Sequence, residues 1–85
     1  MDLALLGFTS TGQDTWQYNA KGLTITVHQK ITGRWVATIN GTGWDAASAQ
    51  EALSTVLKKG IQQRMMLIQR TDNELVELAR IYEAL

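Results

Sequence analysis

The sequence contains no cysteine, and this absence excludes several kinds of chemistry at once. Without cysteine there is no disulfide framework, no thiolate nucleophile and no cysteine-based zinc or iron–sulfur site. Nothing marks an oxidising compartment, so we expect a cytoplasmic location. The apolar run in MDLALLGF is short and follows an acidic residue, which is atypical of a signal peptide or a membrane span. We therefore expect no membrane contact.

Histidine is almost as scarce, since His28 is the only one. It lies on the polar face of a predicted strand, among threonines, which favours a surface or hydrogen-bonded role over catalysis or metal binding. Glu74 and Glu77 lie three residues apart, but carboxylates in a first helical turn are explained by capping and by the helix dipole. We predict no enzyme activity, no catalytic residue, no metal and no cofactor.

Proline is also absent, and no linker, repeat or low-complexity segment divides the 85 residues. We treat residues 1–85 as a single domain. Its 45% hydrophobic and 19% charged residues have the balance of a globular protein. A domain of this size buries only about 60% of its unfolded surface, so binding to a partner would add to its stability.

Between residues 15 and 40 the sequence alternates between apolar and polar side chains. The segment GLTITVHQKI places an apolar residue at every second position, which is typical of a half-buried strand. Glycine-containing turns at 19–22 and 32–33 separate this segment from its neighbours. The pattern predicts a three-stranded antiparallel β-meander with strands near 15–19, 22–31 and 34–40.

A helical period replaces the alternation after the strands. Apolar residues recur at spacings of three and four through 45–70, with Asp45 expected as the N-cap and Trp44 as a hydrophobic staple. Gly60 interrupts this stripe and marks either a kink or a close packing point. Thr71 and Glu74 form a capping box before a last helix over 72–85. The predicted fold class is α+β, a β-meander followed by a packing helix and a C-terminal helix (β-β-β-α-α).

Gly41 and Gly43 precede the first helix, a position where glycine-rich loops often bind phosphate. A Walker-type loop requires a lysine followed by serine or threonine, and a dinucleotide fingerprint requires a parallel βαβ unit. Neither is present, and the carboxylate of Asp45 would repel an anion from the helix start. We therefore interpret the two glycines as supports for a tight strand-to-helix turn.

Five residues of this segment form a pattern of two glycines, a capping residue and two alanines: Gly41, Gly43, Asp45, Ala49 and Ala52. The pattern is similar to the junction between the third strand and the last helix of double-stranded-RNA-binding domains. The resemblance covers about residues 15–59 and implies a β-β-β-α core. Where that family presents lysines to RNA phosphates, this chain has Ala46, Ala47 and Gln50, so the contacts that supply RNA affinity are absent. Residues 51–53, Glu-Ala-Leu, also resemble the helix start of HicB-type antitoxin domains, which share the meander.

Aromatic and apolar residues provide the main candidates for a binding surface. Trp16, Tyr18 and Trp35 are predicted on one face of the sheet, either in the core or on the face that the helix leaves uncovered. On the uncovered face, these three side chains would be available to bind a protein. The C-terminal helix carries more apolar residues than one packing stripe requires. Three of its residues join the predicted protein contacts: Leu75, Leu78 and Tyr82.

Charge is distributed unevenly although the formal net charge is zero. Three basic and four acidic groups in residues 1–51 give −1, four basic groups in 52–71 give +4, and one basic and four acidic groups in 72–85 give −3. Either the last two helices neutralise each other, within one chain or between two, or the basic segment binds nucleic acid. If the basic segment binds nucleic acid, the contact residues are Lys58, Lys59, Arg64 and Arg70.

These observations favour a non-enzymatic protein-binding module that acts as an adaptor, a regulator or a stoichiometric inhibitor. Small proteins of phages and other mobile elements often act in this way. We expect a homodimer, or an obligate protein partner, built on the two C-terminal helices. The alternative is a nucleic-acid-binding regulator that uses the basic segment 58–70 as a dimer.

Overall fold

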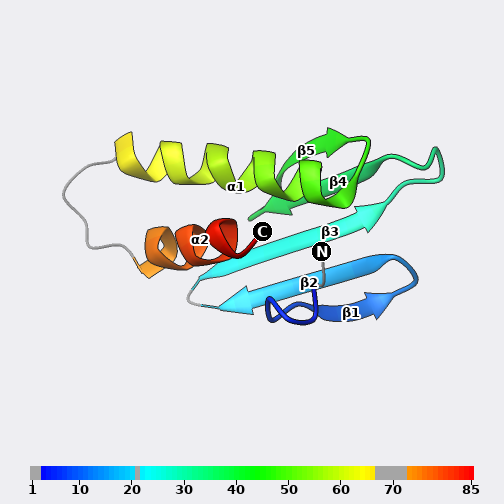
Figure 1. Ribbon diagram of the computed structural model, residues 1–85, viewed down its shortest axis with the longest axis horizontal. Helices are drawn as coiled ribbons and strands as arrows, with labels where there is room; N and C mark the ends of the chain where they lie inside the picture. The colour runs from blue at the N-terminus through cyan, green and yellow to red at the C-terminus, as the bar shows by residue number, and fades with distance from the viewer. Residues whose placement is uncertain (1–2, 21, 67–72) are drawn as a thin grey trace.

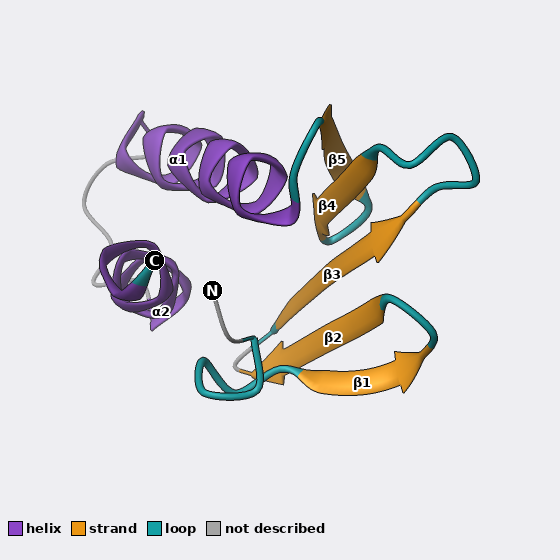
Figure 2. Cartoon of the chain, turned by 45° about the vertical axis from the view of Figure 1, so that its right-hand side comes forward, coloured by secondary structure: helices purple, strands orange, loops and turns teal. Residues whose placement is uncertain are grey.

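The computed structural model describes residues 3–20, 22–66 and 73–85. Within these residues, a five-stranded antiparallel sheet is covered by two helices (Figure 1). The strands are neighbours in chain order, so the sheet is a meander. Both helices lie on the same side of the curved sheet (Figure 2). The elements are β1 Thr9–Gly12, β2 Thr15–Ala20, β3 Leu23–Gln29, β4 Trp35–Ile39, β5 Thr42–Ala46, α1 Ala49–Met66 and α2 Asn73–Ala84.

The α+β class and the three predicted strands are confirmed, and these strands are β2, β3 and β4. Leu23, Ile25 and Val27 are at most 1% exposed, as the alternating pattern requires. The prediction of only three strands is wrong, because β1 and β5 add one strand at each edge. Neither edge strand has an alternating apolar face: β1 is the exposed run TSTG, and β5 reads TGWDA.

Gly41 lies in a β-hairpin turn, which corrects its assignment to a strand-to-helix junction. Asn40 and Gly41 have φ angles of 49° and 90°, the left-handed values that a two-residue type I′ turn requires. The side chain of Asn40 accepts a hydrogen bond of 2.8 Å from the backbone N–H of Thr24, so the turn is tied to β3. At Gly43, in β5, an added Cβ would lie 3.1 Å from Cγ2 of Thr38. The resemblance to double-stranded-RNA-binding domains predicted a strand-to-helix junction at Gly41 and Gly43. In the structure this junction lies between Ala46, the end of β5, and Ala49, the start of α1.

The helix α1 begins at Ala49, four residues later than predicted, and Ser48 is its N-cap. The hydroxyl of Ser48 accepts a hydrogen bond of 3.1 Å from the N–H of Glu51, and its carbonyl accepts one of 3.0 Å from the N–H of Ala52. Serine and aspartate cap helices about equally well, so the local sequence did not distinguish Ser48 from Asp45.

Asp45 instead lies in β5, where its carboxylate pairs with Lys30 and Arg34 from the loop between β3 and β4. Hydrogen bonds from Lys30, and then from Arg34, hold the pKa of Asp45 below its ordinary value. Trp44 is not a staple, because it lies in β5 and the residue before the actual N-cap Ser48 is Ala47. The ammonium of Lys59 lies 4.6 Å from the centre of the Trp44 ring. The predicted capping box of Thr71 lies outside the described residues.

Ser48→Ala tests the corrected helix start. We expect it to lower the free energy of unfolding by about 0.5–2 kcal/mol, because the N–H of Glu51 in the first turn loses its side-chain acceptor. Ser54→Ala is the matched control, since that hydroxyl donates to a carbonyl inside α1 and caps nothing. Urea unfolding of both variants measures the difference, and equal losses would contradict the assignment of Ser48 as the cap.

The hydrophobic core lies between the sheet and both helices. Its strand residues include Ile25, Val27 and Ala37, which pack against apolar residues of α1 and α2. The segment before β1 adds Leu3, Leu6 and Phe8, whose burial the sequence did not indicate. The ring of Phe8 lies 5.3 Å from that of Tyr18 in β2. Among the described residues, neither helix has the length and apolar character needed to cross a membrane.

Candidate functional site

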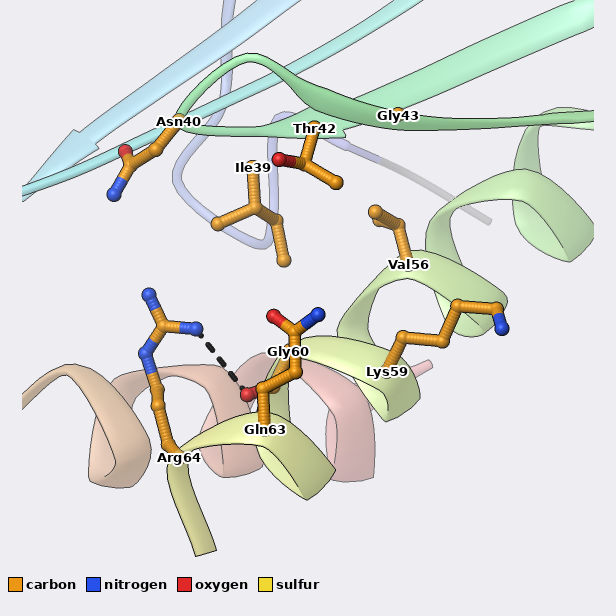
Figure 3. A pocket seen from close by; sticks show the side chains of 9 residues that line it. All are labelled: Ile39, Asn40, Thr42, Gly43, Val56, Lys59, Gly60, Gln63 and Arg64. Carbon is orange, nitrogen blue, oxygen red and sulfur yellow. Dashed lines mark hydrogen bonds between the residues drawn. The ribbon is translucent and has the colours of Figure 1, made fainter. Parts of the chain in front are cut away.

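A pocket of about 230 Å³ lies between the β4–β5 hairpin and α1 (Figure 3). Its apolar part consists of Ile39 and Val56, with Gly60 contributing backbone only. Polar side chains surround this apolar part. The hairpin supplies Asn40 and Thr42, and α1 supplies Lys59, Gln63 and Arg64.

Gly60 allows α1 to pack closely against the sheet beside this pocket. A Cβ at this position would lie 3.1 Å from Cδ1 of Ile39 and 3.5 Å from Cδ1 of Leu78. Of the two alternatives that the sequence left open, the close packing point is therefore the correct one. Because residue 60 is a glycine, the floor of the pocket has no side chain at this position.

Arg64 is held rigidly at one side of the pocket. Its Nη1 donates to the carbonyl of Gly60 at 3.2 Å, and its Nη2 donates to Oε1 of Glu74 in α2 at 3.0 Å. The side chain is only 15% exposed, and its Nε has no hydrogen-bond partner among the described residues. Because two bonds within the protein fix the guanidinium, little conformational entropy remains to be lost when a ligand binds.

Gln63 and Lys59 complete the polar side of the pocket. In Figure 3 the amide of Gln63 points toward the hairpin, and the stem of Lys59 runs along the side of the pocket near Val56. Both residues are exposed. The ammonium of Lys59 lies 4.6 Å from the centre of the Trp44 ring, in a cation–π contact.

The three aromatic residues predicted for binding share one face of the sheet, and it is the face under the helices. Trp16 pairs with Val27 and Tyr18 with Ile25, both of which are buried. Trp16 and Trp35 are partly buried against the core. The alternative that placed these aromatics on the uncovered face is therefore wrong.

Tyr18 forms a network with Glu77 and Arg80 of α2. Its hydroxyl donates to Oε1 of Glu77, and the same oxygen accepts from Nε of Arg80 at 2.8 Å. Nη2 of Arg80 also lies 3.2 Å from the Tyr18 hydroxyl. Burial, together with the bond to Glu77, raises the pKa of Tyr18, while Arg80 opposes the rise. Sequence reasoning missed this network because Tyr18 and Glu77 are 59 residues apart.

The predicted contacts on the last helix lie at different depths. Leu78 is completely buried in the core of its own chain, Leu75 is half-buried and Tyr82 is exposed. Leu78 is therefore not available on the surface of the folded chain.

The four basic residues of the nucleic-acid alternative do not form a single surface in the described part of the chain. Lys59 and Arg64 line the pocket, and Lys58 is exposed outside the pocket lining. Arg64 is already paired with Glu74, and Arg70 lies outside the described residues. Among the residues that the structure describes, no group of three histidine, aspartate or glutamate side chains is placed to bind a metal.

No protein-family model, curated protein or solved structure matches this chain. Its function therefore has to be inferred from its own residues.

Proposed function

We propose that the chain is a non-enzymatic protein-binding module of the adaptor or regulator class, and that its two helices form the contact surface. The occupant that we propose for this surface is a second copy of the chain. The carrying observation is that large apolar side chains remain exposed on both helices although the core beneath them is complete. Met65 on α1 is 62% exposed and Val76 on α2 is 61% exposed.

The apolar residues of this surface come from both helices, which lie side by side (Figure 1). Glu77 faces β2, and by helical geometry Leu75 and Tyr82 lie on the other side of the buried Leu78, toward α1. Hydrogen bonds between Gln50 and the carbonyl of Leu85, and between Arg64 and Glu74, hold the helices side by side. We call the following set the helical surface: Ile61, Met65, Leu75, Val76, Ala79 and Tyr82.

Charge complementarity favours a second copy as the partner. Lys58 lies two turns before Met65 on α1, and Glu83 lies two turns after Val76 on α2, so each helix has an exposed charge on the same side as its exposed apolar residue. Arg80 is also exposed on this side of α2, but its guanidinium is paired with Glu77. In a two-fold interface the same surface of both chains meets, and α1 of one chain can lie against α2 of the other. Lys58 would then face a carboxylate while the apolar residues pack together.

Val76→Glu tests this proposal. We expect the unchanged chain to sediment as a dimer at micromolar concentration and the variant to sediment as a monomer, because a carboxylate would be buried in the interface. Its circular dichroism spectrum should be unchanged, since Val76 contributes little to the core. Sedimentation equilibrium over a hundredfold dilution measures the mass.

Ile31→Glu is the matched control, because it also replaces an exposed β-branched residue with a carboxylate, in the loop between β3 and β4. It should leave the dimer intact. Lys58→Glu should weaken the dimer, and the exchange Lys58→Glu with Glu83→Lys should restore it. A monomer at every concentration would contradict the proposal. Binding of nucleic acid that falls steeply with added salt would instead support the alternative function.

A further inference from the structure

We propose that the pocket between the β4–β5 hairpin and α1 binds a carboxylate attached to a small branched aliphatic group. The carboxylate belongs either to a free small acid or to the C-terminal residue of a peptide. This site is independent of the proposed dimer, because the pocket is lined by Lys59 and Gln63, not by any residue of the helical surface.

The size and floor of the pocket define the aliphatic part of the ligand. Its volume of about 230 Å³ is below the range of about 300–1,000 Å³ that is typical for drug-sized ligands, so the ligand is small. Ile39 and Val56 line the floor with branched aliphatic carbon, and Gly60 leaves room beside them. A branched group of three or four carbons would bury apolar surface there without requiring the helix to move.

The polar residues define the charged part. The pocket lining contains two cations, Lys59 and Arg64, and no carboxylate among the residues described. The two anchored bonds of Arg64 use one N–H on each terminal nitrogen, which leaves a further N–H on each for a ligand. A planar carboxylate matches the geometry of a guanidinium. The amides of Asn40 and Gln63 and the hydroxyl of Thr42 provide further donors.

The neighbouring sheet edge distinguishes the two sources of the carboxylate. β5 is the last strand of the sheet, and Gly43 of this strand lines the pocket. Ile39 and Thr42 close the hairpin as a hydrogen-bonded pair, so the alternating ladder leaves the backbone groups of Gly43 pointing away from β4. A peptide can pair with this edge, as extended peptides do in other strand-binding sites, whereas a free acid cannot.

Titration of the isotope-labelled protein with isovalerate, followed by NMR, tests the site. We expect saturable shifts of the backbone amides of Gly43 and Gly60 and of the side-chain amides of Asn40 and Gln63. Isovaleramide, which has the same shape without the charge, should bind about tenfold more weakly, since a charge-assisted bond is replaced by a neutral one. Acetate should also bind more weakly because it lacks the aliphatic group.

Two isosteric variants locate the binding. Gln63→Glu places a negative charge in the pocket and should weaken isovalerate binding by about tenfold or more through like-charge repulsion. Gln62→Glu makes the same change one residue earlier, outside the pocket lining, and should leave the affinity within about twofold. Lys59→Gln, which removes one cation of the lining, should also weaken binding.

Binding of a short peptide that ends in valine, measured with a free and with an amidated C-terminus, distinguishes a peptide C-terminus from a free small acid as the ligand. Tighter binding of the free peptide than of isovalerate, lost on amidation, supports a peptide terminus. Equal binding of peptide and isovalerate supports a free acid. The proposal is overturned if isovalerate gives no saturable shift at the pocket, if isovaleramide or inorganic phosphate binds more tightly, or if Gln62→Glu weakens binding as much as Gln63→Glu does.

Discussion

Leu78→Glu is expected to unfold the chain, whereas Val76→Glu, two residues earlier on the same helix, should leave it folded. Leu78 is completely buried and packs where α1 and α2 meet near Gly60. An unpaired carboxylate there would cost several kcal/mol, which is comparable with the total stability of about 5–15 kcal/mol of a typical small domain. Circular dichroism and urea unfolding measure the outcome.

Leu78→Ala provides a measurement in a variant that retains enough stability to fold. We expect it to lower the free energy of unfolding by about 2–5 kcal/mol, because a cavity remains in a well-packed core. Val76→Ala, at an exposed position, should change it by less than about 0.5 kcal/mol. A folded, monomeric Leu78→Glu variant would show that Leu78 lies in an interface and not in the core of its own chain.

Arg80→Met is expected to lower the free energy of unfolding by about 1–3 kcal/mol, because it removes a charged donor from a carboxylate that cannot reach water freely. The side chain of Glu77 is only 11% exposed, whereas that of Arg80 is 51% exposed. Removal of the arginine is therefore expected to cost more than Glu77→Gln, which leaves Arg80 able to contact solvent. Urea unfolding of both variants at neutral pH provides the comparison.

The double variant Glu77→Leu with Arg80→Met is the control for this network. Replacement of a buried ion pair by apolar residues of similar size is often nearly neutral. We therefore expect the double variant to be more stable than Arg80→Met alone, although the hydroxyl of Tyr18 loses its acceptor. A double variant whose loss equals the sum of the losses of Glu77→Leu and Arg80→Met, each measured alone, would show that Glu77 and Arg80 do not interact energetically.

The sequence by itself determined the features that depend on neighbouring residues. The period of two in β3 buries Leu23, Ile25 and Val27 because successive side chains of a strand point to opposite faces. Gly22 and Gly33 adopt positive φ angles in the turns on either side, as their positions predicted. The change to a helical period likewise indicated two helices after the sheet. Each of these features is decided within a few residues, where local steric and hydrogen-bonding preferences are sufficient.

Only the tertiary structure decided the features in which distant segments compete or meet. Asp45 and Ser48 are equally good caps, but Asp45 lies in β5, where it is paired with Val36 of β4 and forms ion pairs with Lys30 and Arg34, while Ser48 caps α1. The apolar pattern of α2 does not reveal that Leu78 is buried while Val76 is exposed, because that depends on how α2 is rotated against α1 and the sheet. The pocket also depends on the packing of distant segments, because Gly60 allows α1 to approach the β4–β5 hairpin closely. The side chains that line the pocket come from these two separate parts of the chain, so the sequence alone did not predict it.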